Sequence, residues 1–228
     1  EQDRYLHTAS PDWRDQIIYF LMLDRIEDGD PSNNEQGLNE YDPADSHKYS
    51  GGDIKGVIDR LDYIEDLGAT AVWTPPPVAN QWWSEEAKFS GYHGYWARDF
   101  TKVDEHYGTM QDFKSLSCAL HKRKMYHVMD IVVNHTGDFF DYEKSAITHD
   151  PVTGFRATNP GSPTDAPKGF PFNLNDPRRA EDRDAGAYNW SGELYDYYDR
   201  NRELTEQLAN LDDIDTTKPA VSEAFMLI

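Results

Sequence analysis

The chain has 228 residues, of which 38% are hydrophobic and 13% aromatic, so it can bury a sizeable core. Its 42 acidic residues against 22 basic ones give a formal net charge of −20, which disfavours nucleic acids and anionic membrane surfaces as partners. The single cysteine, Cys118, excludes an internal disulfide, and no apolar run approaches the length needed to span a membrane.

Short apolar runs alternate with helical patterns along the chain. Residues 16–23, 69–74 and 128–133 are typical of buried strands, and the third run is apolar at five of its six positions. Residues 53–67 and 109–124 place apolar side chains at helical spacing. This alternation predicts right-handed strand-helix-strand units and a parallel sheet.

The expected helix ends carry capping residues. Asp53 can cap the start of the first helix, and Gly68 can end it. Thr109 begins the second helix, and Pro219 stands at the start of a third.

Polar residues interrupt and follow the third apolar run. Asp130 lies inside it, so we expect either a buried structural acid or a member of a polar site, because a carboxylate there must be paired or hydrogen-bonded. Asn134 and His135 come where the strand ends. In parallel α/β proteins the carboxyl ends of strands carry binding groups, so these two side chains are candidate ligands.

Oxygen-bearing side chains cluster around a Gly-Pro turn early in the chain, and further oxygens follow before the first helix. Such oxygens suit a hard cation, whereas a plain turn rich in Asp and Asn is the alternative. The candidate ligands are Asp28, Asp30, Asn33, Asn34, Gly51 and Asp53.

Aromatic residues are dense in the loop 78–108. Sugars lay their apolar ring faces on aromatic planes, so aromatics beside His93 suit a carbohydrate cleft. Aromatics can also simply hold a loop on the core, and we favour this reading for Trp82, Phe89 and Phe100.

Two strings resemble motifs of the α-amylase family, glycoside hydrolase family 13. Asp-Ile-Val-Val-Asn-His at 130–135 resembles the first signature region, and Gly-Tyr-His-Gly-Tyr-Trp at 91–96 resembles the family's Tyr-His-Gly-Tyr-Trp. The resemblance implies that Tyr95 stacks on the sugar at subsite −1, and that His93 and His135 bind substrate. It also implies that Asn134 is a calcium ligand and that Asp130 is a buried structural acid.

Two further strings extend the resemblance. The 28–53 cluster resembles the additional N-terminal calcium site of some bacterial α-amylases and cyclodextrin glucanotransferases. Leu-Ala-Asn-Leu-Asp-Asp-Ile-Asp at 208–215 resembles the family's fifth region, with Asn210 where the usual calcium-binding Asp stands. A neutral amide there should bind Ca²⁺ more weakly than a carboxylate.

The resemblance implies the first part of a (β/α)₈ barrel, which normally needs roughly 250 residues. Residues 1–136 would form three β/α units of the barrel, 137–212 the loop excursion called domain B, and 213–228 the start of the third barrel helix. The family's nucleophile, general acid and transition-state-stabilising Asp match no motif in this sequence. We assign Glu85 and Glu86 to the solvated surface.

The expected function is that of a retaining glycosidase acting on α-glucans such as starch, maltooligosaccharides or cyclodextrins, with calcium as cofactor. This chain would carry the sugar-binding and calcium-binding part, without the catalytic carboxylates, so it should be inactive alone. The alternative is a non-catalytic relative, or a truncated form with a carbohydrate-binding or assembly role. A start at Glu1 suggests a processed chain, the apolar last residues suggest a truncated end, and the resemblance implies a secreted or periplasmic protein.

Overall fold

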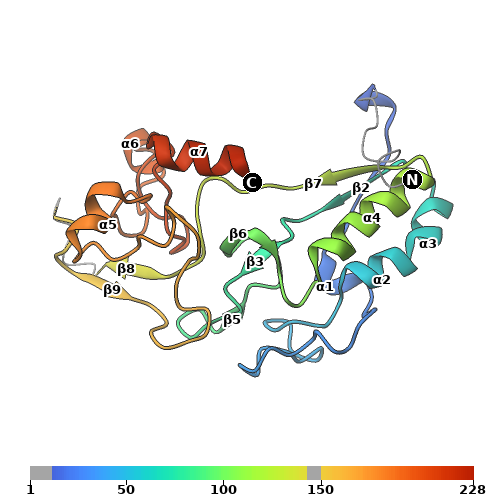
Figure 1. The fold of residues 1–228 in the computed structure, drawn as a ribbon, viewed down its shortest axis with the longest axis horizontal. Coiled ribbons are helices and arrows are strands. Elements are labelled where there is room, and N and C mark those ends of the chain that lie inside the picture. Colours follow the sequence, from blue (N-terminus) through green and yellow to red (C-terminus); the bar gives the residue numbers. More distant parts are fainter. Residues whose placement is uncertain (1–11, 143–149) are drawn as a thin grey trace. The chain divides into compact units, whose positions relative to one another are not determined.

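A computed structural model describes residues 12–142 and 150–228. The chain, drawn in Figure 1, divides into two compact units. Unit 1 comprises Glu1–Ala79, Tyr92–Gly94 and Lys102–Ile131; unit 2 comprises Asn80–Gly91, Tyr95–Thr101 and Val132–Ile228.

Unit 1 contains a three-stranded parallel sheet. Its strands are β1 (Ile18–Phe20), β2 (Ala71–Thr74) and β7 (Tyr126–Met129), in the order β1-β2-β7. Ala71 in the middle strand pairs with Ile18 on one side and Tyr126 on the other. The three apolar runs therefore form one parallel sheet, as predicted.

Four helices accompany this sheet. They are α1 (Leu23–Ile26), α2 (Ile54–Asp59), α3 (Leu61–Asp66) and α4 (Met110–Lys122). Asp53 caps α2 by accepting a hydrogen bond from the Gly56 N–H at 2.7 Å, as expected. The single helix predicted over 53–67 is wrong, because Arg60, with a ψ of 2°, separates α2 from α3.

Helix α4 begins where the sequence predicts. Thr109 accepts from the Asp112 N–H, and the Asp112 carboxylate accepts from the Thr109 N–H, which forms a complete capping box. Helix α4 packs on α2 and on β7 (Figure 1). Its buried residues Leu116 and Leu120 are each worth about 2 kcal/mol of apolar burial. The surrounding core includes Leu21, Leu23, Ile54, Val57, Leu61, Ile64, Val72 and Met125.

The third apolar run differs from its prediction. Strand β7 ends at Met129, so Asp130 lies beyond it and is only partly buried, although its N–H still donates to the Thr74 carbonyl at 3.0 Å. Met129, Ile131 and Val133 are exposed by 47%, 65% and 43%. Within the described residues β7 is paired along one side only, by β2. The expected strand covered on both faces, with a buried Asp130, is therefore wrong.

Short elements make up most of the remaining chain. Three two-stranded sheets are β3-β6, β4-β5 and β8-β9. Helix α6 is a single turn, whereas the helix expected at Pro219 forms with proline in its first turn. The bounds are η2 (Trp13–Asp15), β3 (Val78–Asn80), β4 (Trp83–Ser84), β5 (Phe89–Ser90), β6 (Ala97–Val103), β8 (Phe140–Tyr142), β9 (Phe155–Ala157), α5 (Ala180–Ala185), α6 (Arg200–Glu203) and α7 (Pro219–Leu227).

Aromatic packing replaces a large sheet in unit 2. Phe140 is fully buried, and its ring contacts Phe155, Tyr188 and Trp190 at centroid distances of 5.3–5.6 Å. Such rings contribute large buried areas with defined geometry, so they can hold an irregular segment in one conformation. In the described part of the chain, no helix has the length and apolar character needed to cross a membrane.

Candidate functional site

Three residues of the 91–96 motif, Tyr92–Gly94, belong to unit 1. Gly94 has a φ of +89°, and a Cβ there would lie 2.5 Å from the Pro76 carbonyl oxygen, so the turn requires glycine. The Tyr107 hydroxyl donates to the Tyr92 carbonyl. The ring of His93 lies 5.6 Å from that of Tyr92 at an angle of 65°. Backbone and ring contacts therefore restrain the segment that carries His93.

Tyr95 and His135 come together in unit 2. The Nε2 atom of His135 lies 3.1 Å from the Tyr95 carbonyl oxygen, although the residues are 40 positions apart. Because a carbonyl only accepts, Nε2 must carry the proton, which leaves Nδ1 as the acceptor. Burial lowers the pKa of His135, against a smaller opposing effect of the hydrogen bond to Tyr95. A neutral imidazole of fixed tautomer can accept a hydrogen bond from a sugar hydroxyl.

The second half of the motif is fixed to β3 and the residue after it. The Trp96 N–H donates to Asn80 Oδ1 at 2.9 Å, and its carbonyl accepts from the Gln81 N–H at 2.8 Å. Phe89 packs against the Trp96 ring at 6.1 Å. Tyr95 is therefore followed directly by an anchored residue, which limits the positions available to its ring.

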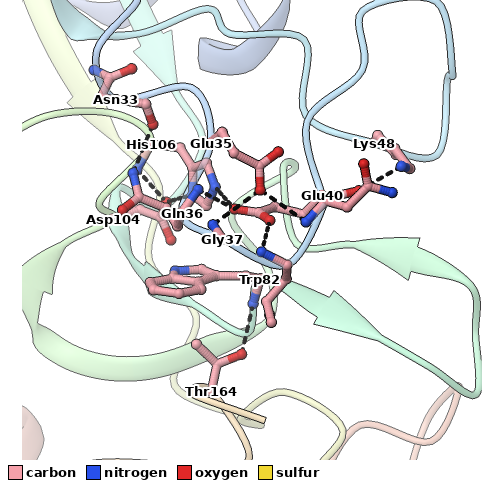
Figure 2. A network of polar contacts seen from close by, with 12 residues as sticks. Asn33, Glu35, Gln36, Gly37, Glu40, Lys48, Trp82, Asp104, His106 and Thr164 are labelled. Carbon is pink, nitrogen blue, oxygen red and sulfur yellow. Dashed lines mark hydrogen bonds and ion pairs between the residues drawn. The ribbon is translucent and has the colours of Figure 1, made fainter.

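Other aromatics of the loop hold structure together, as expected. Phe100 is 7% exposed and packs against Phe172 and Phe225 at 4.8 and 5.1 Å. The Trp82 N–H donates to Thr164 Oγ1 at 3.3 Å (Figure 2). The ring contacts support a packing role for Phe100, whereas the Trp82 bond is made by its backbone and its ring lies 5.6 Å from the guanidinium of Arg98.

The candidate cation ligands of the 28–53 cluster pair with one another. The Asn33 amide donates to Asp53 at 3.1 Å, and the Asn34 amide donates to Asp28 at 2.7 Å. A Cβ on Gly51, whose φ is +92°, would lie 2.8–2.9 Å from the Asn34 amide, so the Gly51 backbone lies directly against this side chain. The structure thus brings five of the six predicted residues together, and the backbone carbonyl of the sixth, Asp30, accepts from the Asn33 N–H at 3.1 Å.

The amide oxygens of this cluster fit a hard cation. Asn33 Oδ1 and Asn34 Oδ1 are both buried and have no hydrogen-bond partner, which is costly for an acceptor. A Ca²⁺ ion coordinated by amide, carbonyl and carboxylate oxygens would satisfy them. The sixth residue, Asp30, is instead bound to Lys55 and Ser32. No group of three or more His, Cys, Asp or Glu residues is arranged for a metal in the described chain.

A buried ion network holds the loop that carries Asn33 (Figure 2). Gln36 donates to the Asn33 carbonyl at 2.8 Å, and its N–H donates to Glu40. His106 bonds Glu40 through Nε2 at 3.1 Å and Asp104 through Nδ1 at 2.8 Å. Burial lowers the pKa of His106, but the hydrogen bonds to both carboxylates outweigh this effect and raise the pKa to about 9. His106 is therefore an imidazolium at neutral pH.

Asn134 contacts a carboxylate that our sequence reasoning did not include. Its amide donates to Asp213 Oδ1 at 3.5 Å, and the Asn189 amide donates to Oδ2 at 2.8 Å. Burial raises the pKa of Asp213 to about 6, against a lowering by Asn189. Asn210 itself adopts a φ of +60° in a turn and is partly buried. The acidic pair at 212–213, inside the 208–215 string, was the available sequence signal for Asp213.

A second buried acid was also missed. Asp212 is fully buried and accepts hydrogen bonds from the Phe139 N–H at 3.2 Å and the Phe140 N–H at 3.3 Å. Burial raises its pKa well above the ordinary value, and the charge of Asp138 adds to this effect. Asp212 thus fixes the chain just after the signature region that contains His135.

The exposed glutamate pair lacks the environment of a catalytic acid. Glu86 forms an ion pair with Arg156 at 2.8 Å, and Glu85 forms one with Lys88 at 2.7 Å. Both ion pairs lower the pKa of the carboxyl concerned, whereas a general acid needs a raised pKa. Their assignment to the solvated surface agrees with these contacts.

Known proteins resemble nearly the whole chain. The model of the α-amylase catalytic domain matches residues 20–227. A cyclomaltodextrin glucanotransferase of Klebsiella oxytoca is 44% identical over 62% of this chain and 22% of its own length. An α-amylase of Streptomyces lividans is 35% identical over 79% of this chain and 22% of its own length.

Solved structures agree with these relatives. An Anoxybacillus α-amylase matches with a TM-score of 0.68 and 31% identity, covering 95% of this chain and 37% of that one. The cyclomaltodextrin glucanotransferase CldA matches with a TM-score of 0.74 and 27% identity, covering 92% and 40%. The chain therefore spans about a fifth of the curated relatives and less than half of the solved ones. Because the α-amylase catalytic domain matches residues 20–227, the chain belongs to the α-amylase family, glycoside hydrolase family 13.

Proposed function

We propose that this chain is the sugar-binding and calcium-binding part of a retaining glycosidase that acts on α-glucans such as starch, maltooligosaccharides or cyclodextrins. The observation that carries the proposal is the hydrogen bond between His135 and the Tyr95 carbonyl, which unites two motif residues of the family. Tyr95 would offer its ring to the sugar face, and His135 and His93 would bind hydroxyls. These groups orient the glycosidic bond, and orientation lowers the entropic part of the barrier.

Cleavage with retention needs two more groups. A carboxylate nucleophile and a carboxylic acid must flank the bond at about 5 to 5.5 Å from each other. Glu85 and Glu86 do not suit these roles, because both are exposed and ion-paired. We propose that both carboxylates belong to the (β/α)₈ barrel of which β1, β2 and β7 form the first three strands, outside residues 1–228.

Calcium would act as a structural ion. Asp28, Asn33, Asn34, Gly51 and Asp53 would hold it in unit 1, where two buried amide oxygens lack partners. In unit 2 the proposed ligands are Asn134 and Asn210. When bound, Ca²⁺ supplies fixed positive charge that joins segments distant in sequence and adds to the free energy of unfolding.

A product analysis tests the activity. The full-length protein is incubated with soluble starch, pullulan, maltooligosaccharides and cyclodextrins, and reducing ends and product anomers are measured. We expect turnover with retained α-configuration on at least one of these substrates. Absence of turnover on all of them, with intact sugar binding, would favour the non-catalytic alternative.

The compartment is part of the proposal. One relative, 33% identical over 61% of this chain, is the periplasmic α-amylase of Escherichia coli. A secreted or periplasmic location would give the enzyme access to polymeric glucans. Detection of the full-length protein only in the cytosolic fraction of its native cell would contradict this assignment.

A further inference from the structure

One arginine in unit 1 joins the loop before Gly51 to the aromatic motif. Arg25 is the third residue of the short helix α1, and its side chain is 31% exposed. Its guanidinium donates to Ser50 Oγ, to the Ser46 carbonyl at 3.2 Å and to the Lys48 carbonyl at 2.8 Å. The carbon at its centre lies 3.9 Å from the centroid of the Tyr92 ring. Its edge thus holds a loop while its face covers a ring.

The neighbouring aspartate ties this arginine to the candidate cation site. Asp24 is buried, and its carboxylate lies 3.0 Å from Arg25 Nε. The same carboxylate accepts from the Ser50 N–H at 2.9 Å and the Gly51 N–H at 3.2 Å. Gly51 in turn lies against the Asn34 amide, whose buried oxygen has no partner. The Asp24 carboxylate thus contacts both the Gly51 backbone and the Arg25 guanidinium.

The face of the Arg25 guanidinium covers the Tyr92 ring, next to the candidate sugar-binding residue His93. Tyr92 packs on the core, and its carbonyl accepts from the Tyr107 hydroxyl. The ring covered by Arg25 contacts the His93 ring, and His93 is followed by the tightly packed Gly94. The guanidinium is planar and rigid, so fixing its edge also fixes the plane on which Tyr92 stacks.

We propose that Arg25 is a positioning residue that couples the two sites: a cation bound by the 28–53 cluster strengthens sugar binding at His93 through Arg25 and Tyr92. This inference rests on the proposed function. A cation ordering Gly51 and Asn34 lowers the entropy of the loop that Arg25 holds, so the sugar has less ordering left to do. Such coupling is reciprocal, and the sugar strengthens cation binding by the same factor.

Calorimetry on the full-length protein measures this coupling. Acarbose, the ligand in the solved α-amylase of Geobacillus thermoleovorans, serves as the sugar probe. Its Kd is measured in EGTA and in saturating CaCl₂, and the Kd of Ca²⁺ is measured with and without acarbose. We expect the wild type to bind each ligand at least about fivefold more tightly in the presence of the other.

Variants at both ends locate the connection. The coupling factor is the ratio of the Kd of one ligand without the other ligand to its Kd with it. Arg25→Met and Arg25→Lys should bring this factor to about one, since neither Met nor Lys has the planar stacking face of arginine. Asn34→Ala should do the same, whereas Tyr92→Phe keeps the ring and should keep the coupling. The matched control is Arg123→Met, since Arg123 is 29% exposed and pairs with Asp62 and Glu65 of α3. Circular dichroism verifies that each variant folds. If Arg25→Met does not fold, the coupling factor of Arg25→Lys tests the role of Arg25.

The outcomes separate the two proposals. A wild-type factor of about one, with acarbose and Ca²⁺ both binding, overturns the coupling and leaves the proposed function standing. A factor that persists in folded Arg25 variants overturns the role of Arg25. If the wild type binds no acarbose, the proposed function fails and the inference fails with it. Loss of coupling in the Arg25 and Asn34 variants, but not in Arg123→Met, supports the inference.

Discussion

Replacing His106 with glutamine should remove one contribution to the free energy of unfolding that the wild type loses as the pH rises from about 6.5 to about 9. His106 is 1% exposed, stacks on Tyr49 at 3.6 Å, and bonds the carboxylates of Glu40 and Asp104. A histidine pKa raised from 6.5 to about 9 corresponds to about 3 kcal/mol, at about 1.4 kcal/mol for each pH unit between the two values. This figure agrees with the roughly 3–5 kcal/mol that breaking a buried ion pair costs.

The sign of the pH dependence follows from the raised pKa. The folded state binds the proton more tightly than the unfolded chain, so the contribution is fully present below about pH 6.5 and is lost as pH rises through about 9. His106→Gln cannot make this contribution at any pH. The free energy of unfolding of the wild type should therefore exceed that of the variant by about 3 kcal/mol near pH 6, and this difference should largely disappear near pH 10.

Urea unfolding of the full-length protein, followed by circular dichroism at both pH values, measures this difference. Subtracting the variant removes the titration of other groups, which both proteins share. The matched control is His47→Gln, because the His47 side chain is 59% exposed and its pair with Asp45 lies at the surface. The control should change the free energy of unfolding by less than about 0.5 kcal/mol. A difference between wild type and His106→Gln that is equal at both pH values would refute the reasoning.

Three other predictions concern the proposed sites. Tyr95→Ala should lower kcat/KM on soluble starch by about a hundredfold without unfolding the protein, whereas Trp82→Ala should mainly lower the melting temperature; an unchanged kcat/KM for Tyr95→Ala contradicts the sugar-site assignment. Removing Ca²⁺ with a chelator should lower the melting temperature, since an ion at about a hundred times its Kd adds roughly 2.7 kcal/mol to the free energy of unfolding. Identical melting of metal-free and calcium-loaded protein argues against both calcium sites. Asn210→Asp should bind Ca²⁺ more tightly in calorimetry, because a carboxylate is the stronger ligand for a hard cation; an equal or weaker affinity would exclude Asn210 as a ligand.

Local patterns in the sequence were sufficient for most elements of unit 1. Apolar runs and helical spacing predicted β1, β2, β7 and α4, and Thr109 and Asp53 capped their helices as expected. These features depend on neighbours a few positions apart, so composition and periodicity carry them. The break at Arg60 and the early end of β7 at Met129 were not predicted, because both depend on what packs around each segment.

For the candidate sites, too, local motifs and tertiary structure gave different information. The motif strings pointed to Tyr95, His135 and the 28–53 residues as candidates by residue type alone. Only the folded chain brought Glu40 to His106 across 66 positions, and Asn134 to Asp213 across 79. Hydrogen bonds between such distant residues depend on how loops return to each other, and no local period records that. Tertiary packing also decided which acids are buried, leaving Asp130 partly exposed while excluding water from Asp212.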